Sequence, residues 1–205
     1  MGSLGAASAD TSVCGTIAGQ HWTIAGSPYR VTCNINVALL TIDLGVTVLF
    51  QSNYLFEVDG FLTASGTLAQ PIIFTRTNGG GWNGIFFNYC ENGSEMDYCN
   101  ISAVQGGSAI SCITANPVLR SCVVFNNASS GEAGGLYVDN RSYPGSEMLV
   151  QSCTFSNNTS AFHGGAVSAH TGTNEIRFVS CSFIPESGVR CQCCGQKRPE
   201  VGVFS

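Results

Sequence analysis

The stretches Ser121-Cys122-Val123-Val124-Phe125-Asn126-Asn127 and Ser152-Cys153-Thr154-Phe155-Ser156-Asn157-Asn158 are two copies of one pattern, placed 31 residues apart. The pattern, apolar-x-x-Cys-x-apolar, recurs with cysteine spacings of 23, 31 and 28 residues. Its four copies are Met96-x-x-Cys99-x-Ile101, Leu119-x-x-Cys122-x-Val124, Val150-x-x-Cys153-x-Phe155 and Phe178-x-x-Cys181-x-Phe183. Self-similarity at such a period is typical of repeat architectures. Hairpins of an antiparallel sandwich would instead give alternating strands every 8–12 residues, without a fixed motif.

A second strand follows a glycine pair in each of the first three repeats. The pairs are Gly106-Gly107, Gly134-Gly135 and Gly164-Gly165. Two repeats also carry paired asparagines at the same offset after the cysteine, Asn126-Asn127 and Asn157-Asn158. Glycine and asparagine tolerate left-handed backbone conformations, so both pairs suit tight corners between the strands of one coil.

These features predict an all-β chain that forms a right-handed parallel β-helix of about seven coils. One coil cannot bury its own inward side chains, so the coils above and below must cover them. Residues 30–87 supply earlier coils through alternating segments such as Val31-Thr32-Cys33-Asn34-Ile35-Asn36-Val37. We therefore expect an N-terminal extension or cap at 1–19, the β-helix at 20–185 and an irregular cysteine-rich tail at 186–205.

Composition supports the all-β prediction and excludes some functions. Only 10% of the residues are charged, so the chain lacks the Lys, Glu and Arg that usually form exposed helix faces. A net charge of −5 with eight scattered basic residues argues against nucleic-acid binding. No apolar run approaches the 18 residues that would predict a transmembrane segment. Residues 1–10 lack the basic start and apolar stretch of a signal peptide. Three interpretations remain open: a mature N-terminus, one end of a fragment, or an intact cytosolic protein.

Several segments resemble known families. The stretches are Leu40–Val48, Val58–Thr67, Pro71–Thr75 and Trp82–Ile85, with Trp22-Thr23 and Ser27-Pro28-Tyr29 before them. They are similar to the opening coils of bacterial right-handed β-helix surface proteins. The later Cys-x-Phe-x-Asn-Asn and Gly-Gly-Ala elements resemble repeats of polymorphic outer-membrane-protein-like passenger domains and of the wider pectate-lyase-like superfamily. The resemblance covers roughly residues 20–185 and implies an extracellular or cell-surface location, but no particular ligand. No anchor, sorting signal or transporter barrel is recognisable after it.

The eleven cysteines divide by position. For Cys99, Cys122, Cys153 and Cys181 we expect a buried core ladder, because parallel inward side chains fit a disulfide torsion poorly and a linear stack does not give tetrahedral metal geometry. Cys14 and Cys33 are candidates for a disulfide that ties the N-terminal segment over the open end of the core. Cys191 and Cys194 form C-x-x-C in the tail, but a second such pair is missing, so a zinc site is not favoured.

Catalysis receives little support from the acidic residues. Glycoside cleavage needs two carboxylates about 5–10 Å apart, and the 13 acidic residues are dispersed. Asp97 and Arg120 share one offset before their cysteines, so we expect them to stack as a surface ion pair, with Gln151 and Val179 continuing the column. His163 and His170 could meet Asp139 across neighbouring coils, although solvated loop histidines are commoner. The sequence singles out no catalytic, cofactor-binding or metal-binding residue.

Two functional hypotheses remain. The first is a non-catalytic secreted or cell-surface scaffold, structural or adhesive, that self-associates end to end or laterally, since a solenoid end exposes unpaired strand edges. The second is a polysaccharide-binding or polysaccharide-cleaving β-helix. Its support is analogy of fold together with tyrosines that could stack on sugar rings, namely Tyr54, Tyr89, Tyr137 and Tyr143.

Overall fold

A computed structural model describes residues 10–77, 80–90, 93–142, 147–171, 174–184 and 190–191. Within these residues the secondary structure is β-strand apart from one short 3-10 helix, η1 (Ile24–Gly26). No helix in the described ranges is long and apolar enough to cross a membrane. The all-β prediction is confirmed.

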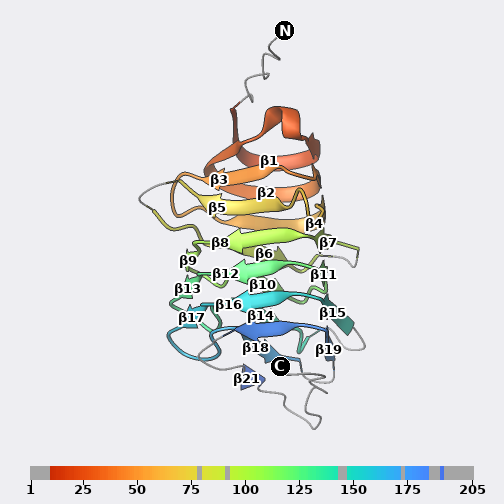
Figure 1. Ribbon diagram of the computed structural model, residues 1–205, viewed down its shortest axis with the longest axis vertical. Coiled ribbons are helices and arrows are strands. Elements are labelled where there is room, and N and C mark those ends of the chain that lie inside the picture. The colour runs from red at the N-terminus through yellow and green to blue at the C-terminus, as the bar shows by residue number, and fades with distance from the viewer. Residues whose placement is uncertain are drawn as a thin grey trace.

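The strands stack into three faces that the chain visits in turn (Figure 1). Face A contains the first parts of β1 (Thr11–Trp22) and β2 (Tyr29–Asp43), then β3 (Thr47–Phe50), β5 (Ile72–Arg76), β8 (Cys99–Ser102), β12 (Val123–Phe125), β16 (Thr154–Ser156) and β20 (Ser182–Ile184). Face B contains the middle of β1 and β2, the start of β4 (Phe56–Ser65), then β6 (Ile85–Asn88), β10 (Ile110–Ile113), β14 (Leu136–Asp139), β18 (Val167–His170) and β21 (Arg190–Cys191). Face C contains the ends of β1, β2 and β4, then β7 (Glu95–Asp97), β11 (Val118–Arg120), β15 (Glu147–Gln151) and β19 (Glu175–Val179).

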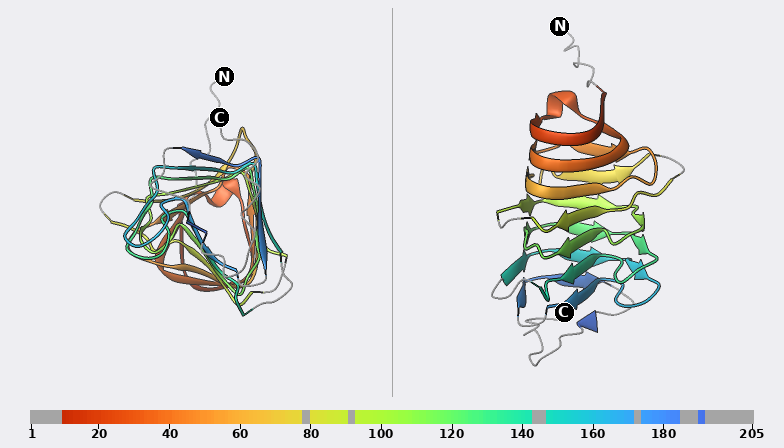
Figure 2. Two further views of the ribbon diagram at one scale, coloured as in Figure 1. Left: turned by 90° about the horizontal axis from the view of Figure 1, so that it is seen from below. Right: turned by 180° about the vertical axis from the view of Figure 1, so that it is seen from behind.

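Every named pairing is parallel and joins a strand to its equivalent one round later. Face C is occupied in seven successive rounds, by β1, β2, β4, β7, β11, β15 and β19. A small fourth sheet of β9 (Gln105–Gly106), β13 (Ala128–Ser129) and β17 (Thr159–Ser160) lies between faces A and B. Viewed along the stack, the rounds superpose around one axis (Figure 2). This arrangement is consistent with a β-solenoid.

One continuous core runs through the stack because inward and outward residues alternate along each strand. In β2, for example, Val31, Ile35, Val37, Leu40 and Ile42 are buried, and most of the residues between them reach solvent. Since the strands of neighbouring rounds are in register, each inward side chain lies over an inward side chain of the next round.

The corner between faces C and A explains the repeated motif. The residue before each motif cysteine has a left-handed backbone, with φ of 49° at Tyr98, 53° at Ser121, 54° at Ser152 and 54° at Ser180. This conformation ends the face C strand and turns the chain, so that the cysteine points inward at the start of face A. A non-glycine residue in this region carries a steric cost, which the packed neighbours must offset.

Two expected boundaries differ from the structure. β1 begins at Thr11 and pairs with β2 along its length, so residues 11–19 belong to the first round and not to an N-terminal extension. Val13 and Ile17 are buried, so β1 contributes inward side chains to the core as the later strands do. In the predicted irregular tail, Arg190–Cys191 forms β21, which extends face B beneath β18. The other residues of 186–205 lie outside the described ranges.

Candidate functional site

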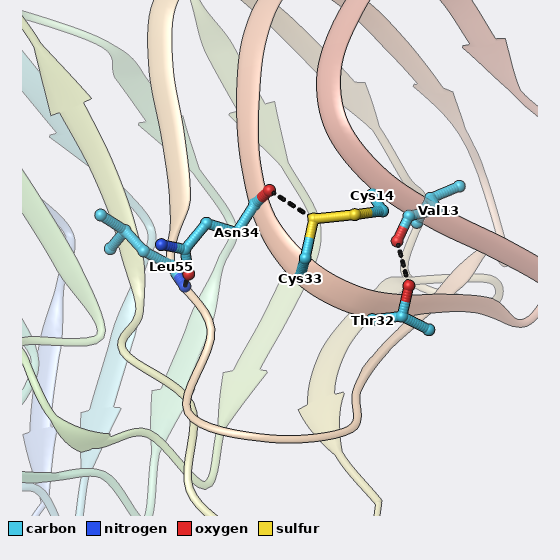
Figure 3. The surroundings of a disulfide bond; sticks show 6 residues. All are labelled: Val13, Cys14, Thr32, Cys33, Asn34 and Leu55. Atoms are coloured by element: carbon cyan, nitrogen blue, oxygen red, sulfur yellow. Dashed lines mark hydrogen bonds between the residues drawn. A yellow bond between two sulfur atoms is a disulfide. The ribbon is translucent and has the colours of Figure 1, made fainter.

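A disulfide joins Cys14 and Cys33, the two cysteines for which the sequence suggested one (Figure 3). It spans the corner between faces A and B, where the β1–β2 register is interrupted between Val13 and Gly15. Cys14 is exposed and Cys33 half-buried, so the bond lies on the outside of the stack. It therefore fastens the first two rounds to each other at a bulge. The sequence had suggested that it would cover the open end of the core, which it does not do.

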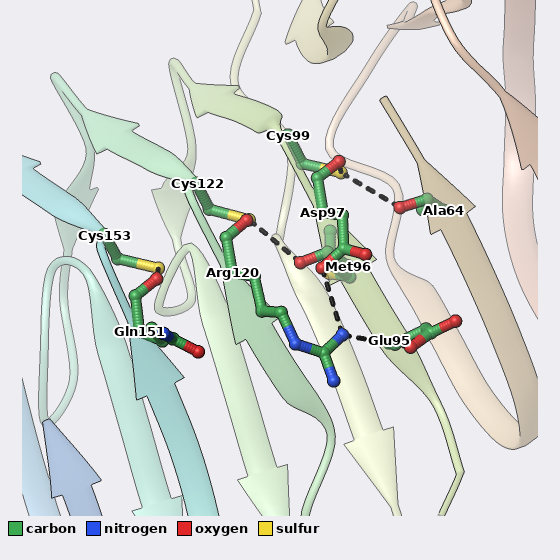
Figure 4. Close-up of polar contacts among 9 residues, drawn as sticks. All are labelled: Ala64, Glu95, Met96, Asp97, Cys99, Arg120, Cys122, Gln151 and Cys153. Carbon is green, nitrogen blue, oxygen red and sulfur yellow. Dashed lines mark hydrogen bonds and ion pairs between the residues drawn. The ribbon is translucent and has the colours of Figure 1, made fainter. Parts of the chain in front are cut away.

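The four motif cysteines form a column on the inside of face A. The register pairs Val123 with Asn100 and with Thr154, and Thr154 with Ser182, which places each preceding cysteine over the next. Figure 4 shows Cys99, Cys122 and Cys153 in a row with their sulfur atoms pointing the same way. These three are buried, and Cys181, in the last described round, is half-buried. All four are free thiols.

Each thiol has a carbonyl acceptor at the corner. Cys122 Sγ donates to the carbonyl oxygens of Met96 at 3.2 Å and Arg120 at 3.4 Å, and Cys181 repeats the arrangement with Val150 and Val179 at 3.3 and 3.6 Å. The carbonyls of Arg120 and Val179 also accept the backbone N–H groups of Tyr98 and Ser152, so the thiol is a second, weak donor at this corner. A small side chain with a weak donor therefore fits the position, where it fills the core and contacts the corner carbonyls.

Neighbouring thiols and burial raise the pKa values of two cysteines of the column. The Cys122 thiol, and to a lesser extent burial, raise the pKa of Cys153 to about 12, against a lowering by the Cys181 thiol. The Cys153 thiol and then burial raise the pKa of Cys181. At neutral pH these groups are protonated thiols, which makes them weak nucleophiles.

Two further buried thiols lie inside the stack away from this column. Burial raises the pKa of Cys90 to about 11 and that of Cys112 well above its usual value. Cys112 is in register with Phe87 and Val138, so its neighbours on both sides are carbon side chains. The sequence did not identify Cys112 as a core residue, although its alternation with Ile110 indicates it.

The paired asparagines have divided roles. Asn126 and Asn157 adopt the left-handed backbone expected of a corner, with φ of 55° and 53°. Their neighbours Asn127 and Asn158 are buried and form an amide ladder, in which Asn127 Nδ2 donates to Asn158 Oδ1 at 2.9 Å. Asn127 Oδ1 accepts from the N–H of Val104 at 3.0 Å, so the ladder continues into the round above. The ladder satisfies buried backbone groups where the side sheet leaves face A.

An ion-paired strip lies on the outside of face C (Figure 4). Arg120 Nη1 lies 3.1 Å from Glu95 Oε2 and 3.2 Å from Asp97 Oδ1. The hydrogen bonds that Arg120 donates to Glu95 and then to Asp97 raise the pKa of Arg120. The predicted stacking of Asp97 with Arg120 is confirmed, and Gln151 follows in the same column. Glu95 was not anticipated. Because both carboxylates accept from one guanidinium, the strip is closer to a structural ion pair than to an acid–base pair.

A second polar cluster lies beside face B, where two equivalent loops of adjacent rounds meet. His163 Nδ1 contacts Glu132 Oε2, and His170 Nε2 lies 4.0 Å from the same oxygen. The ring of Tyr137 meets the ring of His170 edge-on at 5.9 Å. His170 is in register with Asp139, as the sequence suggested, whereas His163 contacts Glu132 instead.

The glycine pairs bring these loops close together. A Cβ at Gly134 would lie 2.5 Å from the carbonyl oxygen of Thr159, and one at Gly135 would lie 2.4 Å from that of Ala166. Neither glycine has a positive φ, so they are required by close backbone approach and not by left-handed geometry. The place of Glu132 depends on this loop path, which the sequence pattern does not encode.

Asp139 and Tyr137 complete the cluster. Hydrogen bonds from Arg141 hold the pKa of Asp139 below its usual value. Burial, and then the charges of Asp139 and Glu132, raise the pKa of Tyr137. The arrangement offers imidazole, carboxylate and phenol groups within a small area of the outer surface. These groups are able to bind a polar ligand.

Other expected site residues are not brought together. Tyr89 is 69% exposed after β6, Tyr54 packs against the core before β4, and Tyr143 lies outside the described residues. Cys193 and Cys194 of the tail also lie outside them, and only the backbone of Cys191 is described. Within the described ranges, no group of three or more His, Cys, Asp or Glu side chains is arranged to hold a metal ion.

No family model, curated protein or solved structure matches the chain.

Proposed function

We propose that the chain is a right-handed parallel β-helix, secreted or displayed at the cell surface, that serves as a non-catalytic structural or adhesive scaffold. The right-handed form is supported by the parallel pairing of every round, because connections between parallel strands of one sheet are almost always right-handed. The resemblance to surface β-helix repeats points to the same fold and location.

The observation that carries the proposed location is the contrast between the two kinds of cysteine. The surface pair Cys14–Cys33 is oxidised, whereas the buried column remains reduced. Exposed structural disulfides persist in oxidising compartments and are rare in the cytosol. The buried thiols remain reduced there because their raised pKa values and burial protect them from exchange.

The scaffold role is supported by the outer faces. Several charges that reach the surface on face C are paired with one another, as in Arg120 with Glu95 and Asp97, and Arg177 with Glu147 at 3.1 Å. Self-association is supported by the last described round, where inward-pointing Phe178 and Phe183 are only partly buried. Apolar side chains that reach solvent beside a strand edge favour pairing with another chain.

Alkylation of thiols in living cells before lysis, followed by mass spectrometry, tests the location. We expect Cys14 and Cys33 to be found as a disulfide, and a protease added outside the cells to cleave the protein. Reduced Cys14 and Cys33 together with protection from external protease would contradict the proposal. Light scattering over a range of concentrations tests self-association, and a monodisperse monomer at high concentration would contradict that part.

Polysaccharide binding is the second candidate, supported by the cluster of Glu132, His163, His170 and Tyr137 on the outer surface. Imidazole and carboxylate groups hydrogen-bond to sugar hydroxyls, and a tyrosine edge offers an apolar contact. Glycan arrays probed with the wild-type chain and with Glu132→Gln test it. Binding that Glu132→Gln weakens supports this candidate, and absence of binding to any glycan counts against it.

A further inference from the structure

The cysteine column has a geometry that its structural role does not require. Cys99, Cys122, Cys153 and Cys181 occupy one register position in four successive rounds, and their side chains project inward from parallel strands. Figure 4 shows the first three sulfur atoms in a row. Adjacent strands of a sheet are about 4.8 Å apart. The thiols are therefore spaced by one rung along the stacking direction, with their Cβ–Sγ bonds roughly perpendicular to it.

This geometry disfavours a disulfide and a tetrahedral metal site. A disulfide needs sulfur atoms about 2.05 Å apart with a torsion near 90°. Tetrahedral zinc needs four converging ligands. A linear, two-coordinate metal has different requirements. Metal–thiolate bonds are about 2.3 Å long for zinc, so two such bonds end to end span about 4.6 Å, close to one rung.

We propose that neighbouring thiols of this column bind soft d10 cations in linear two-coordinate geometry, first at Cys153 and Cys181. Thiolates are soft ligands that select soft metals such as Cu(I). A cation placed between two rungs meets both sulfur atoms along the stacking axis, at the angle that sulfur favours.

Access decides which pair is loaded first. Cys99, Cys122 and Cys153 are at most 1% exposed, whereas Cys181 is half-buried at the end of the column. Cys153 and Cys181 occupy adjacent rungs, since Thr154 pairs with Ser182, so their two sulfur atoms are neighbours in the column. Cys112 has Phe87 and Val138 as its register neighbours, so no thiol lies directly above or below it in the stack.

With Hg²⁺ as the probe, the reaction breaks two S–H bonds and forms two S–Hg bonds. Two protons are released to solvent, and neither sulfur nor mercury changes oxidation state. The product is uncharged, which suits an apolar core, where an uncompensated charge is costly. The proposal concerns only the column and holds whichever cellular location the protein has.

The test uses the full chain with Cys191, Cys193 and Cys194 replaced by serine, so that the tail cannot capture the metal. We expect the first equivalent of Hg²⁺ to release two protons and to show two sulfur neighbours by X-ray absorption spectroscopy. Cys181→Ser in this background removes one of the two ligands. Since losing an outer-shell partner alone weakens metal sites by about 10–100-fold, we expect a loss on the order of 100-fold or more.

Cys112→Ser is the matched control, since it removes an equally buried thiol and leaves the column intact. We expect it to bind the first equivalent as the background protein does. A single sulfur neighbour, or first-equivalent affinity unchanged by Cys181→Ser, would overturn the proposal. Crystals of the background protein soaked in Hg²⁺ give a measurement that needs no ligand variant. An anomalous peak midway between the Sγ atoms of Cys153 and Cys181 supports the proposal, and a first site elsewhere contradicts it.

Discussion

The first rounds and the cysteine rounds build the same stack with different corners. In the first three rounds β1, β2 and β4 run for 12, 15 and 10 residues and bend continuously from face B to face C. Positive φ values in this region occur at glycine, as at Gly15 and Gly45. From Tyr89 onward the strands are short, and non-glycine residues such as Ser121 and Asn126 adopt the left-handed conformation.

The cores differ in the same way. In the N-terminal half large rings fill the interior, with Phe50 stacked on Trp82 at 4.0 Å and Trp22 on Tyr29 at 4.5 Å. In the cysteine rounds, thiol and amide columns line the corners and bond to backbone groups there. The buried amides pair with backbone groups at the corners, as Asn127 does with the Val104 N–H and the Ile101 carbonyl. Stacked rings persist beside these columns, as in Phe155 on Phe183 at 5.3 Å.

Trp82→Ala tests the aromatic half and should have the largest effect. Trp82 is fully buried, stacks on Phe50 and donates from Nε1 to the carbonyl oxygen of Ser102 at 2.9 Å. Replacing a buried tryptophan with alanine lowers the free energy of unfolding by about 3–5 kcal/mol. Urea denaturation measures the loss. Leu68→Ala, at an 86% exposed position, should stay within about 0.5 kcal/mol of wild type. Equal effects of the two variants would contradict the described core.

Replacing both Cys14 and Cys33 with serine tests the fastening of the first two rounds. The disulfide closes a loop with a sequence separation of 19, for which chain entropy predicts a loss of about 3 kcal/mol. Thermal and urea unfolding measure it. A reducing agent should destabilise the wild type by a similar amount and leave the double variant unchanged. Destabilisation of the double variant by reduction would show that a different disulfide is present.

Asn127→Ala tests the polar corners of the cysteine rounds. It removes the partner of the Val104 N–H, of the Ile101 carbonyl and of Asn158, all in a buried region. Leaving buried polar groups unpaired costs about 1–3 kcal/mol. The matched control is Asn126→Gly, which keeps the left-handed corner at an exposed site and should change stability by about 0.5 kcal/mol or less. A neutral Asn127→Ala would show that the amide ladder contributes little.

Alkaline pH should weaken the cysteine rounds through the thiols. The pKa of Cys153 rises from 9.0 to about 12 on folding, so between these values the unfolded chain has lost a proton that the folded chain retains. The unfolded state then binds fewer protons, and stability falls as pH rises through this window. Below pH 9 the contribution is complete.

Each such thiol contributes a fall of about 1.4 kcal/mol per pH unit within its window. Urea denaturation at pH 8, 9 and 10 measures the slope. Cys153→Ala should show a shallower slope than wild type, and an identical slope would contradict the buried, protonated column.

Arg120→Ala should have the smallest effect, because the strip on face C lies outside both kinds of core. The Arg120 and Glu95 side chains are 39% and 38% exposed, and ion pairs in such positions contribute about 0–1 kcal/mol. Denaturation in low and high salt measures the difference, which should shrink as salt screens the charges. A loss above about 2 kcal/mol would show that the strip stabilises the stack.

The sequence predicted the cysteine rounds better than the rest. The spacing of Cys99, Cys122 and Cys153 predicts the register because each coil needs one inward residue at the same corner. It did not predict the start of the stack at Thr11, since β1 lacks the motif and is recognised only through its pairing with β2. The functional surface was harder to predict. The contact between Glu132 and His163 depends on the path of two loops, which no periodicity encodes.

Sulfur anomalous diffraction from crystals of the native chain tests the stacked register most directly. The account predicts that the Sγ atoms of Cys99, Cys122, Cys153 and Cys181 form one row along the stack, with neighbours about 4.8 Å apart. It also predicts that Cys14 and Cys33 form a bonded pair on the outside of the first two rounds. Sulfur atoms of the four repeats scattered over different faces, or paired as disulfides, would contradict the parallel arrangement of the rounds.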